Sequence, residues 1–398
     1  MNKKLLSLIL IIALVLSLFS LTGCTKQNDP DTPAEPETTT EPAPTEAELK
    51  LADMTLEEKV AQLIFVIPDA FVSSINDEQR NDSKADGTTA VTDEIREMYS
   101  KYPVGGFILF AKNIIDPEQL KQYTSDLHSL GKITPIITID EEGGNITRIA
   151  RNENFSVTKF EPNAKIAETK DTKNAYTLGK TIGAYLTEYG IDLDFAPVAD
   201  VNTNPNNTVI GSRAFGTDPK LAGEMVASVI KGLHDSDNMS CIKHFPGHGD
   251  TSTDTHKGYA ETNKTWDEIK NCEMIPFIAG INAGTDMVMV AHVCAPNVTN
   301  DKTPASLSYT LLTEKLRGEL GYNGVIITDA MNMGAITNEY SSSEAAVLAI
   351  KAGVDIVLCP NDFVKAYNGI LDAVNSGGIT EERLDESVLR ILNLKYKG

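Results

Sequence analysis

Eight short runs of β-branched and apolar residues alternate with longer segments of helical periodicity from about residue 51 onward. Strands that are apolar along almost their whole length and are joined by helices are typical of a buried parallel sheet. The pattern predicts an α/β fold, a single (β/α)₈ barrel of the TIM type with insertions, and the main alternative is a doubly wound open sheet. The runs cover residues 63–67, 106–110, 135–140, 192–200, 239–245, 287–293, 324–329 and 355–360, and the helical segments cover residues 117–130, 175–189, 221–234, 266–282, 309–320, 343–352 and 364–375.

Chemically active side chains stand at the carboxyl ends of these runs, where barrel enzymes place their active sites. They are Asp140, Asp200, Lys243, His244, His292 and Asp329. Turns and helix caps also favour Asp, and this explanation suits Asp200, which precedes an Asn-rich loop. It does not suit Lys243, His244 or His292, because a polar side chain in an apolar strand end is costly unless it is used. We therefore expect these residues to converge on one barrel mouth.

The segment of residues 243–258 contains three of the six histidines and shows no apolar periodicity. Its glycines let the backbone bend, and Asp254 stands two residues before His256, where a carboxylate could orient an imidazole. Asp329 follows an apolar strand, which suits a nucleophile or an electrostatic stabiliser, and His256 suits a proton donor. Covalent glycosidase chemistry requires such a pair of groups.

Two other classes of function remain open on the residues alone. A barrel metallohydrolase could draw its ligands from His244, His248, Asp250, Asp254, His256 and His292. Its ligand spacing is weak, because Phe-Pro-Gly separates His244 from His248 and no His-x-His pair occurs on a strand. The other class is a catalytically silent sugar-binding lipoprotein, which would not need to keep both Asp329 and the Asp254/His256 pair.

The composition is that of an acidic globular protein, 41% hydrophobic and 23% charged, with a formal charge of −21. We expect no nucleic-acid partner, because a protein that neutralises phosphates needs a basic face and no such Lys/Arg cluster occurs. The cysteines downstream of residue 24 show neither a dense disulfide framework nor zinc-type pairs, so we expect buried free thiols. They are Cys241, Cys272, Cys294 and Cys359.

The first 23 residues predict an export signal, because Lys3 and Lys4 precede an apolar run over residues 5–21. The run ends in Leu-Thr-Gly-Cys24, which resembles the lipobox of bacterial lipoproteins, in which Cys24 becomes the lipidated N-terminus. An uncleaved membrane anchor is the alternative. Residues 24–47 then predict a lipidated Cys and a disordered Thr/Pro/Glu linker, and residues 48–398 a catalytic domain outside the cytoplasmic membrane.

Long motifs between about Leu51 and Leu394 closely resemble glycoside hydrolase family 3 and, within it, the bacterial exo-β-N-acetylglucosaminidases of the NagZ type. The motifs are KHFPGHGD at 243–250, DTH at 254–256, TDAMNM at 328–333, DEEGG at 140–144, Asn163, FAPVAD at 195–200 and IGSRAF at 210–215. The resemblance implies a (β/α)₈ barrel that acts on a carbohydrate and needs no cofactor and no metal.

The resemblance also implies roles for individual residues. Asp329 becomes the nucleophile that forms a covalent glycosyl-enzyme with retention of configuration, and His256, paired with Asp254, becomes the general acid/base on a movable loop. The positions that hold the terminal N-acetylglucosamine match Asp140, Arg213, Lys243 and His244, and further site-lining positions resemble Arg148 and His292. His248 is expected to support the shape of the loop.

The β-glucosidases of this family typically take their acid/base from a carboxylate on a second domain. Here the sequence ends at Gly398, after the last expected barrel helix, so we expect the acid to come from the barrel itself. Two departures stand out: Asn145 follows Glu-Gly-Gly where many relatives have Arg, and residues 71–89 form a polar insertion. We expect the insertion to be a surface loop without catalytic importance.

The expected function is that of a monomeric, lipid-anchored, extracytoplasmic exo-hydrolase. It would remove non-reducing terminal β-linked N-acetylglucosamine from peptidoglycan-derived fragments. Some relatives with the same Asp-His dyad transfer the sugar to phosphate, so phosphorolysis stays open, as does a broader β-glycosidase specificity.

Overall fold

A computed structural model describes residues 43–251 and 260–396 and contains a parallel eight-stranded sheet in the order β10-β1-β2-β3-β4-β5-β7-β9. A parallel bridge between Ile327 and Ile356 joins the two end strands, so the sheet closes on itself. The closed sheet confirms the barrel and rules out the doubly wound open sheet. The strands are β1 (Ile64–Val66), β2 (Gly106–Ile108), β3 (Ile136–Ile139), β4 (Leu193–Asp194), β5 (Met239–Phe245), β7 (Met287–Val290), β9 (Val325–Thr328) and β10 (Val357–Leu358).

Each strand lies within one of the eight predicted runs, and apart from Met239 every strand residue is buried. Burial on both faces explains why the runs are apolar throughout, since side chains fill the barrel on one side and helices cover the other. Neighbouring strands pair through residues of these predicted runs: Phe107 of β2 pairs with Ile137 of β3, and Val288 of β7 pairs with Ile326 of β9.

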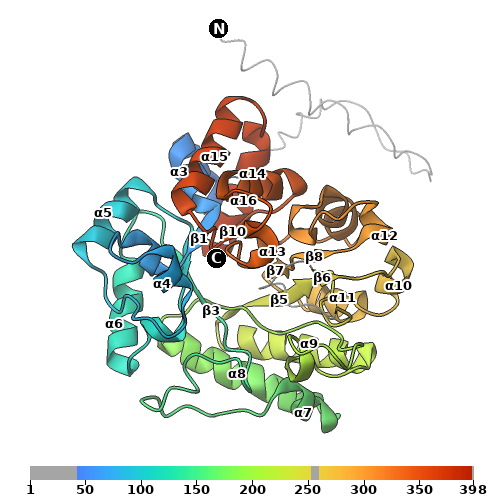
Figure 1. The fold of residues 1–398 in the computed structure, drawn as a ribbon. Helices are drawn as coiled ribbons and strands as arrows, with labels where there is room; N and C mark the ends of the chain where they lie inside the picture. Colours follow the sequence, from blue (N-terminus) through green and yellow to red (C-terminus); the bar gives the residue numbers. More distant parts are fainter. Residues whose placement is uncertain (1–42, 252–259, 397–398) are drawn as a thin grey trace, which may run out of the picture. The chain divides into compact units, whose positions relative to one another are not determined.

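Helices surround the sheet (Figure 1). The longer ones are α2 (Glu46–Asp53), α5 (Asp93–Lys101), α6 (Pro117–His128), α8 (Thr172–Glu188), α9 (Pro219–His234), α11 (Met274–Asn282), η6 (Thr310–Glu319), α14 (Ser342–Ala352), α15 (Phe363–Asn375) and α16 (Glu381–Lys395). The shorter ones are α3 (Leu56–Gln62), η2 (Pro68–Phe71), α4 (Asp77–Asn81), η3 (Ala111–Asn113), α7 (Asn163–Glu168), η4 (Gly211–Arg213), α10 (Trp266–Lys270), α12 (Pro296–Thr299), η5 (Ala305–Leu307) and α13 (Gly334–Thr337).

Local signals fix where several helices begin and end. Asp116 and Asp218 cap α6 and α9 by accepting backbone N–H bonds, and each is followed by a proline, which suits the first helical turn. Ser341 forms a reciprocal capping box with Glu344 at the start of α14, and Gly353 ends that helix with φ of 119°.

The helix predicted over residues 266–282 is wrong as a single element, because the structure divides it into α10 and α11. Pro276 is the third residue of α11, a position near a helix start that proline tolerates, whereas it breaks a helix interior. Glu273 lies in the break, where its buried carboxylate accepts a hydrogen bond from Lys264 Nζ at 2.5 Å. The helix predicted over residues 309–320 is present as the π-helical η6.

The folded domain begins slightly earlier than expected. Thr45 caps α2 and Ala47 is buried against the core, so the last residues assigned to the linker belong to the domain. A second, two-stranded sheet pairs β6 (Ala260–Glu261) with β8 (Val293–Cys294), which the sequence did not predict. The four downstream cysteines are free, as expected, although Cys272 is only partly buried.

None of the helices within residues 43–251 and 260–396 is long and apolar enough to cross a membrane. The predicted signal, Cys24 and most of the predicted linker lie outside the described residues.

Candidate active site

The strand-end residues predicted from the sequence gather at one mouth of the barrel. Asp140 follows β3, Lys243 and His244 belong to β5, and Asp329 follows β9. Because the sheet is parallel and closed, these strand ends face the same side. Lys243 and His244 are almost fully buried, while Asp140 and Asp329 remain partly exposed. Partly exposed carboxylates near the buried ammonium of Lys243 are suited to receive a polar ligand.

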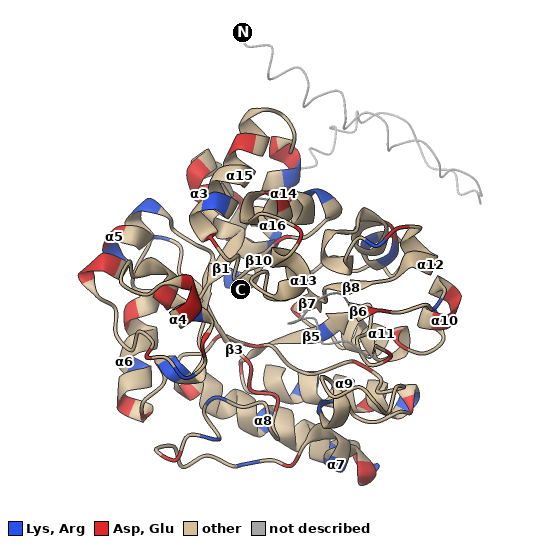
Figure 2. Cartoon of the chain, viewed as in Figure 1, with Lys and Arg blue, Asp and Glu red and all other residues tan. Residues whose placement is uncertain are grey.

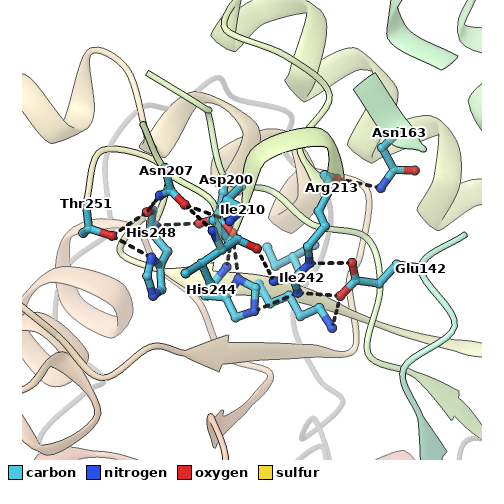
Figure 3. Close-up of polar contacts among 12 residues, drawn as sticks. Glu142, Asn163, Asp200, Asn207, Ile210, Arg213, Ile242, His244, His248 and Thr251 are labelled. Carbon is cyan, nitrogen blue, oxygen red and sulfur yellow. Dashed lines mark hydrogen bonds and ion pairs between the residues drawn. The ribbon is translucent and has the colours of Figure 1, made fainter. Parts of the chain in front are cut away.

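Lys243 stands at the centre of a charged cluster. Its Nζ lies 2.6 Å from Asp140 Oδ1 and 2.6 Å from Glu142 Oε1. Arg148 Nη2 donates to Asp140 Oδ2 at 3.1 Å. Arg213 donates two hydrogen bonds to Glu142, from Nε to Oε2 at 2.9 Å and from Nη2 to Oε1 at 2.7 Å (Figure 3). Three cations therefore hold two carboxylates, with donors and acceptors side by side.

The cluster keeps its members charged. Burial alone raises the pKa of Glu142, but Arg213 and Lys243 outweigh that effect, so the pKa lies well below its ordinary value. The pKa of Asp140 is lowered in the same way, since Lys243 and Arg148 outweigh burial. Burial lowers the pKa of Lys243, but Asp140 and Glu142 raise it further, and the net shift is upward. All three groups stay ionised near neutral pH.

His244 is held by Asp200, which is fully buried. The ring Nδ1 lies 2.7 Å from Asp200 Oδ2, while the backbone N–H of His248 donates to Asp200 Oδ1 at 2.6 Å (Figure 3). Burial raises the pKa of Asp200, but His244 and His248 lower it more, so the net pKa is below the ordinary range. The interpretation of Asp200 as a turn residue is therefore wrong, because this carboxylate orients the imidazole at the mouth.

Asp329 carries a partly exposed carboxylate at the mouth. Its Oδ1 accepts the N–H of Ala330 at 2.8 Å. Burial raises the pKa of Asp329, but the rings of His244 and His292 and the Ala330 N–H together lower it below its ordinary value. An ionised carboxylate on a rigid strand end can act as a nucleophile or stabilise positive charge.

His292 is buried and lies behind the loop of Asp329. Its Nδ1 is 2.8 Å from Ser306 Oγ and its Nε2 is 3.0 Å from the carbonyl oxygen of Ala330. A ring nitrogen that faces a carbonyl oxygen donates to it, so the imidazole fixes the backbone next to Asp329. The structure thus brings His292 to the mouth, where it supports the loop that carries Asp329.

Two buried side chains position the arginines. Glu141 Oε2 accepts the N–H groups of Arg148 and Ile149 at 2.5 and 3.0 Å, which shapes the loop that carries Arg148. Asn163 donates its amide N–H to the carbonyl oxygen of Arg213 at 2.8 Å (Figure 3). Glu141, Glu142 and Asn163 belong to quoted motifs, yet sequence reasoning from strand ends alone missed them, because none of them ends a strand.

Asp254 and His256 lie outside the described residues. The described residues on either side of this gap are linked through Asp250, which accepts from Thr262 Oγ1 at 3.0 Å and lies 3.3 Å from Lys264 Nζ. His248 contacts the same loop just before the gap, since its Nδ1 lies 2.8 Å from Thr251 Oγ1. This contact agrees with the expected support of the loop's shape.

The polar insertion contacts the loop that follows Asp329, and its expected lack of catalytic importance stays a prediction. Helix α4 lies within it, and Asn332 Nδ2, three residues after Asp329, donates to Asn81 Oδ1 at 2.5 Å. Among the described residues, no group of three or more His, Cys, Asp and Glu side chains is placed to hold a metal ion.

Comparisons with known proteins identify the family of the chain. A family model described as "Glycosyl hydrolase family 3 N terminal domain" matches residues 55–394. Beta-hexosaminidase A of Pseudoalteromonas piscicida is 34% identical over 337 residues, which cover 78% of this chain and 56% of that protein. The beta-hexosaminidase of Hydrogenovibrio crunogenus is 36% identical over 299 residues, which cover 74% of this chain and 81% of that protein.

Solved structures are similar as well. A glycoside hydrolase family 3 beta-N-acetylglucosaminidase from Paenibacillus sp. str. FPU-7 has a TM-score of 0.78 at 35% identity, covering 86% of this chain and 62% of that one. The chain therefore spans less than two thirds of the length of this protein and of the Pseudoalteromonas relative. The match of the family model over residues 55–394, with the same barrel in the structure, places the chain in glycosyl hydrolase family 3.

Proposed function

We propose that the chain is a retaining exo-β-N-acetylglucosaminidase. The observation that carries the proposal is the ionised, partly exposed Asp329 at the same mouth as the Asp140–Lys243–Glu142 cluster. Relatives named beta-hexosaminidase at 34 to 36% identity support the substrate class.

In the proposed reaction, Asp329 attacks the anomeric carbon of the terminal sugar. The bond from that carbon to the leaving oxygen breaks, and His256, oriented by Asp254, gives its proton to that oxygen. The same imidazole then takes a proton from water, which attacks the glycosyl-enzyme and restores the carboxylate. Two displacements at one carbon retain its configuration.

The charged cluster would hold the terminal sugar by its hydroxyl groups. Each hydroxyl both donates and accepts, and the cluster offers carboxylate acceptors from Asp140 beside donors from Lys243, Arg148 and Arg213. Because these groups are fixed by each other before the ligand arrives, little ordering is needed when the sugar binds.

Turnover of a chromogenic β-N-acetylglucosaminide, compared with the matching β-glucoside, tests the proposal. We expect faster turnover of the first and a β-configured sugar as the initial product in NMR spectra. Asp329→Asn should lower kcat by a factor of about 10³ or more while the unfolding temperature stays within a few degrees. Three results would each contradict one part of the proposal: preference for the β-glucoside, an α-configured product, or an active Asp329→Asn variant.

Phosphorolysis is a second candidate. A beta-glucoside phosphorylase, BglX, has a TM-score of 0.75 at 25% identity, covering 88% of this chain and 59% of that one. In this variant, phosphate instead of water attacks the glycosyl-enzyme, and a sugar 1-phosphate leaves. Product analysis with and without inorganic phosphate separates the two reactions.

We further propose that the enzyme acts outside the cytoplasmic membrane on peptidoglycan-derived fragments, attached by a lipid on Cys24. The support is the sequence of residues 1–24, and recovery of the full chain in the soluble fraction of cells would contradict the anchor.

A further inference from the structure

Four polar side chains that the proposed reaction does not use join the parts of the chain on either side of residues 252–259. They are Asp250, Thr262, Lys264 and Glu273, and we call them the stem cluster. Asp250 Oδ2 accepts a hydrogen bond from Thr262 Oγ1 at 3.0 Å, and Asp250 Oδ1 lies 3.3 Å from Lys264 Nζ. Lys264 Nζ also lies 2.5 Å from Glu273 Oε1. The cluster thus connects Asp250, before these residues, to three side chains after them.

The chain before residue 252 is fixed by the loop that follows β4. Thr203 Oγ1 donates to Asp250 Oδ1 at 3.2 Å. The backbones pack closely as well, because a β-carbon added to Gly249 would lie 1.9 Å from the carbonyl oxygen of Val201. This part of the chain is therefore attached to the barrel through both its backbone and the side chain of Asp250.

The chain after residue 259 is fixed by the short sheet of β6 and β8. Ala260 pairs with Val293, and the N–H of Thr262 donates to the carbonyl oxygen of Cys294 at 3.0 Å. Residues 252–259 therefore begin and end at anchored positions, and the carboxylate of Asp250 contacts side chains from both anchors.

Glu273 is the buried end of the stem cluster. It lies in the break between α10 and α11, and a β-carbon on Gly247 would lie 2.5 Å from its Cγ. Acidic and basic side chains occur together along β6 and α10 (Figure 2), but the neighbouring side chains of Lys264 and Glu273 are only 24% and 2% exposed. A carboxylate at this depth requires a close cation. Burial lowers the pKa of Lys264, but Glu273 and Asp250 raise it more, so its ammonium stays charged.

The residues between the two anchored positions supply Asp254 and His256 of the proposed acid/base step. Fixing both ends of a loop limits the conformations that it can adopt. General acid catalysis requires the acid within hydrogen-bond reach of the leaving oxygen, and a misplacement of about 1 Å can lower the rate by a factor of about 10². The contacts that join the two anchors therefore bear on the rate of proton transfer.

We propose that Asp250 and Lys264 are positioning residues for the proton donor, because they join the two ends of the segment from which His256 comes. Glu273 holds the ammonium of Lys264 in place from the buried side. None of the three needs to touch the sugar for this role. The inference rests on the proposed glycosidase function and adds residues that act through His256.

The test compares two β-N-acetylglucosaminides that differ only in their leaving group. A 2,4-dinitrophenolate leaves without a proton, whereas a phenol leaving group requires one from the acid. In the full chain, Lys264→Met and Asp250→Ala should each lower kcat/KM for the phenyl substrate by a factor of about 10 to 100. For the dinitrophenyl substrate, kcat/KM should change by less than about twofold. A purely structural role would lower both values together.

Lys264→Arg keeps a cation between the two carboxylates and should recover most of the activity on the phenyl substrate. Lys302→Met is the matched control, because Lys302 is 77% exposed and pairs with Glu261 of β6 at 3.1 Å, outside the stem cluster. An exposed pair contributes little, so this variant should match the parent on both substrates. Asp250→Ala leaves Lys264 paired with Glu273, so it tests the inference even when Lys264→Met does not fold.

Three results would overturn the inference while the glycosidase function stands. The first is an equal loss on both substrates in a variant that keeps the unfolding temperature of the parent, which would show that the cluster only supports the fold. The second is an unchanged kcat/KM for the phenyl substrate in Asp250→Ala. The third is an equally selective loss in Lys302→Met, which would show a general effect of charge near β6. If the parent turns over neither substrate, the proposed function fails and the inference fails with it.

Discussion

Lys243 is a buried ammonium that lies 2.6 Å from each of two carboxylates, those of Asp140 and Glu142. Taking such a charge out of water is expensive, and the cost is recovered only when close partners surround it. Arg213 and Arg148 occupy the outer sides of the same carboxylates. The cluster is therefore a single unit, in which loss of one member leaves an uncompensated charge in the barrel.

Lys243→Met should affect both catalysis and acid stability. The folded-state pKa values of Asp140 and Glu142 are lowered, so their stabilising contribution is present above the unfolded-state values, near pH 4, and disappears as pH falls through the folded values. Removing the ammonium raises both pKa values, so the acid unfolding midpoint should move upward. At pH 7 we expect a loss of about 3 kcal/mol in the free energy of unfolding.

Thermal unfolding between pH 3 and pH 8, with kcat/KM measured at pH 7, checks this prediction. Lys220→Met on the surface of α9 is the control and should match the parent in both measurements. An unchanged acid midpoint in Lys243→Met would show that the two carboxylates do not depend on this ammonium.

Individual site residues were predictable where their chemistry conflicted with their surroundings. Lys243 and His244 stand in an apolar strand, where burying a polar side chain costs free energy unless it has a polar partner. The structure gives both of them such partners at the mouth. Asp200 was not predictable in this way, because an Asp at a strand end has an ordinary explanation as a turn residue. Its role depends on the ring of His244, which lies 44 residues away in sequence.

At the scale of elements, one structural motif occurs three times at the end of the barrel opposite the mouth, where the strands begin. A glycine with positive φ ends a helix, and an Asp follows two residues later, at Gly190 with Asp192, Gly284 with Asp286, and Gly353 with Asp355. Each Asp accepts a backbone N–H from the neighbouring strand, at Ile137, Ser240 and Ile326. Each also meets a basic side chain from a helix, namely His128, His234 and Arg317.

Asp355→Asn should cost more stability than the same change at Asp192. Asp355 is fully buried and lies 2.5 Å from Arg317 Nη2, 3.0 Å from Arg390 Nη1 and 3.8 Å from Arg383 Nη1, so its neutralisation removes the counter-charge that three guanidinium groups share. We expect a loss of about 3 to 5 kcal/mol in the free energy of unfolding. Asp192 is one third exposed, which screens its pair with His128, and Asp192→Asn should cost about 1 kcal/mol or less.

Urea unfolding of both variants, with kcat on a chromogenic substrate as a second readout, checks this difference. Because Asp355 and Asp192 lie at the strand starts, kcat should stay near that of the parent as long as the protein is folded. Equal losses in the free energy of unfolding would indicate that burial does not determine how much these carboxylates contribute to stability.

The strands were predictable as elements because burial on both faces makes them apolar throughout, and all eight lie within predicted runs. Helix continuity was less predictable, since the apolar pattern of residues 266–282 continues across a break that Pro276 and the inward Glu273 create. The contact between the insertion and the loop after Asp329 was also not predictable, because polar residues that make such a contact resemble those of a solvated loop in sequence. Tertiary contacts such as Asn81 with Asn332 decide that case.

At the scale of the whole molecule, the barrel is completed by its first and last helices. Helix α2 packs against α16, where Ala47 is buried and Lys50 Nζ lies 5.6 Å from the ring centroid of Tyr396. Leu51 and Met54 pack against the core cluster as well. The segment predicted to be a linker therefore ends in helix α2, which covers core residues. The loss of stability on truncation depends on whether the truncated chain keeps this helix.

Two shortened chains test this boundary together with the proposed anchor. A chain that begins at residue 44 keeps α2, so its unfolding temperature and kcat/KM should match those of the full chain, while it should leave the membrane fraction for the soluble one. A chain that begins at residue 54 loses Ala47 and Leu51 and uncovers α16, which should cost on the order of 2 to 4 kcal/mol. Calorimetry and cell fractionation measure the two effects separately. Equal unfolding temperatures for both chains would show that α2 adds no stability, and a full chain already present in the soluble fraction would remove the anchor at Cys24.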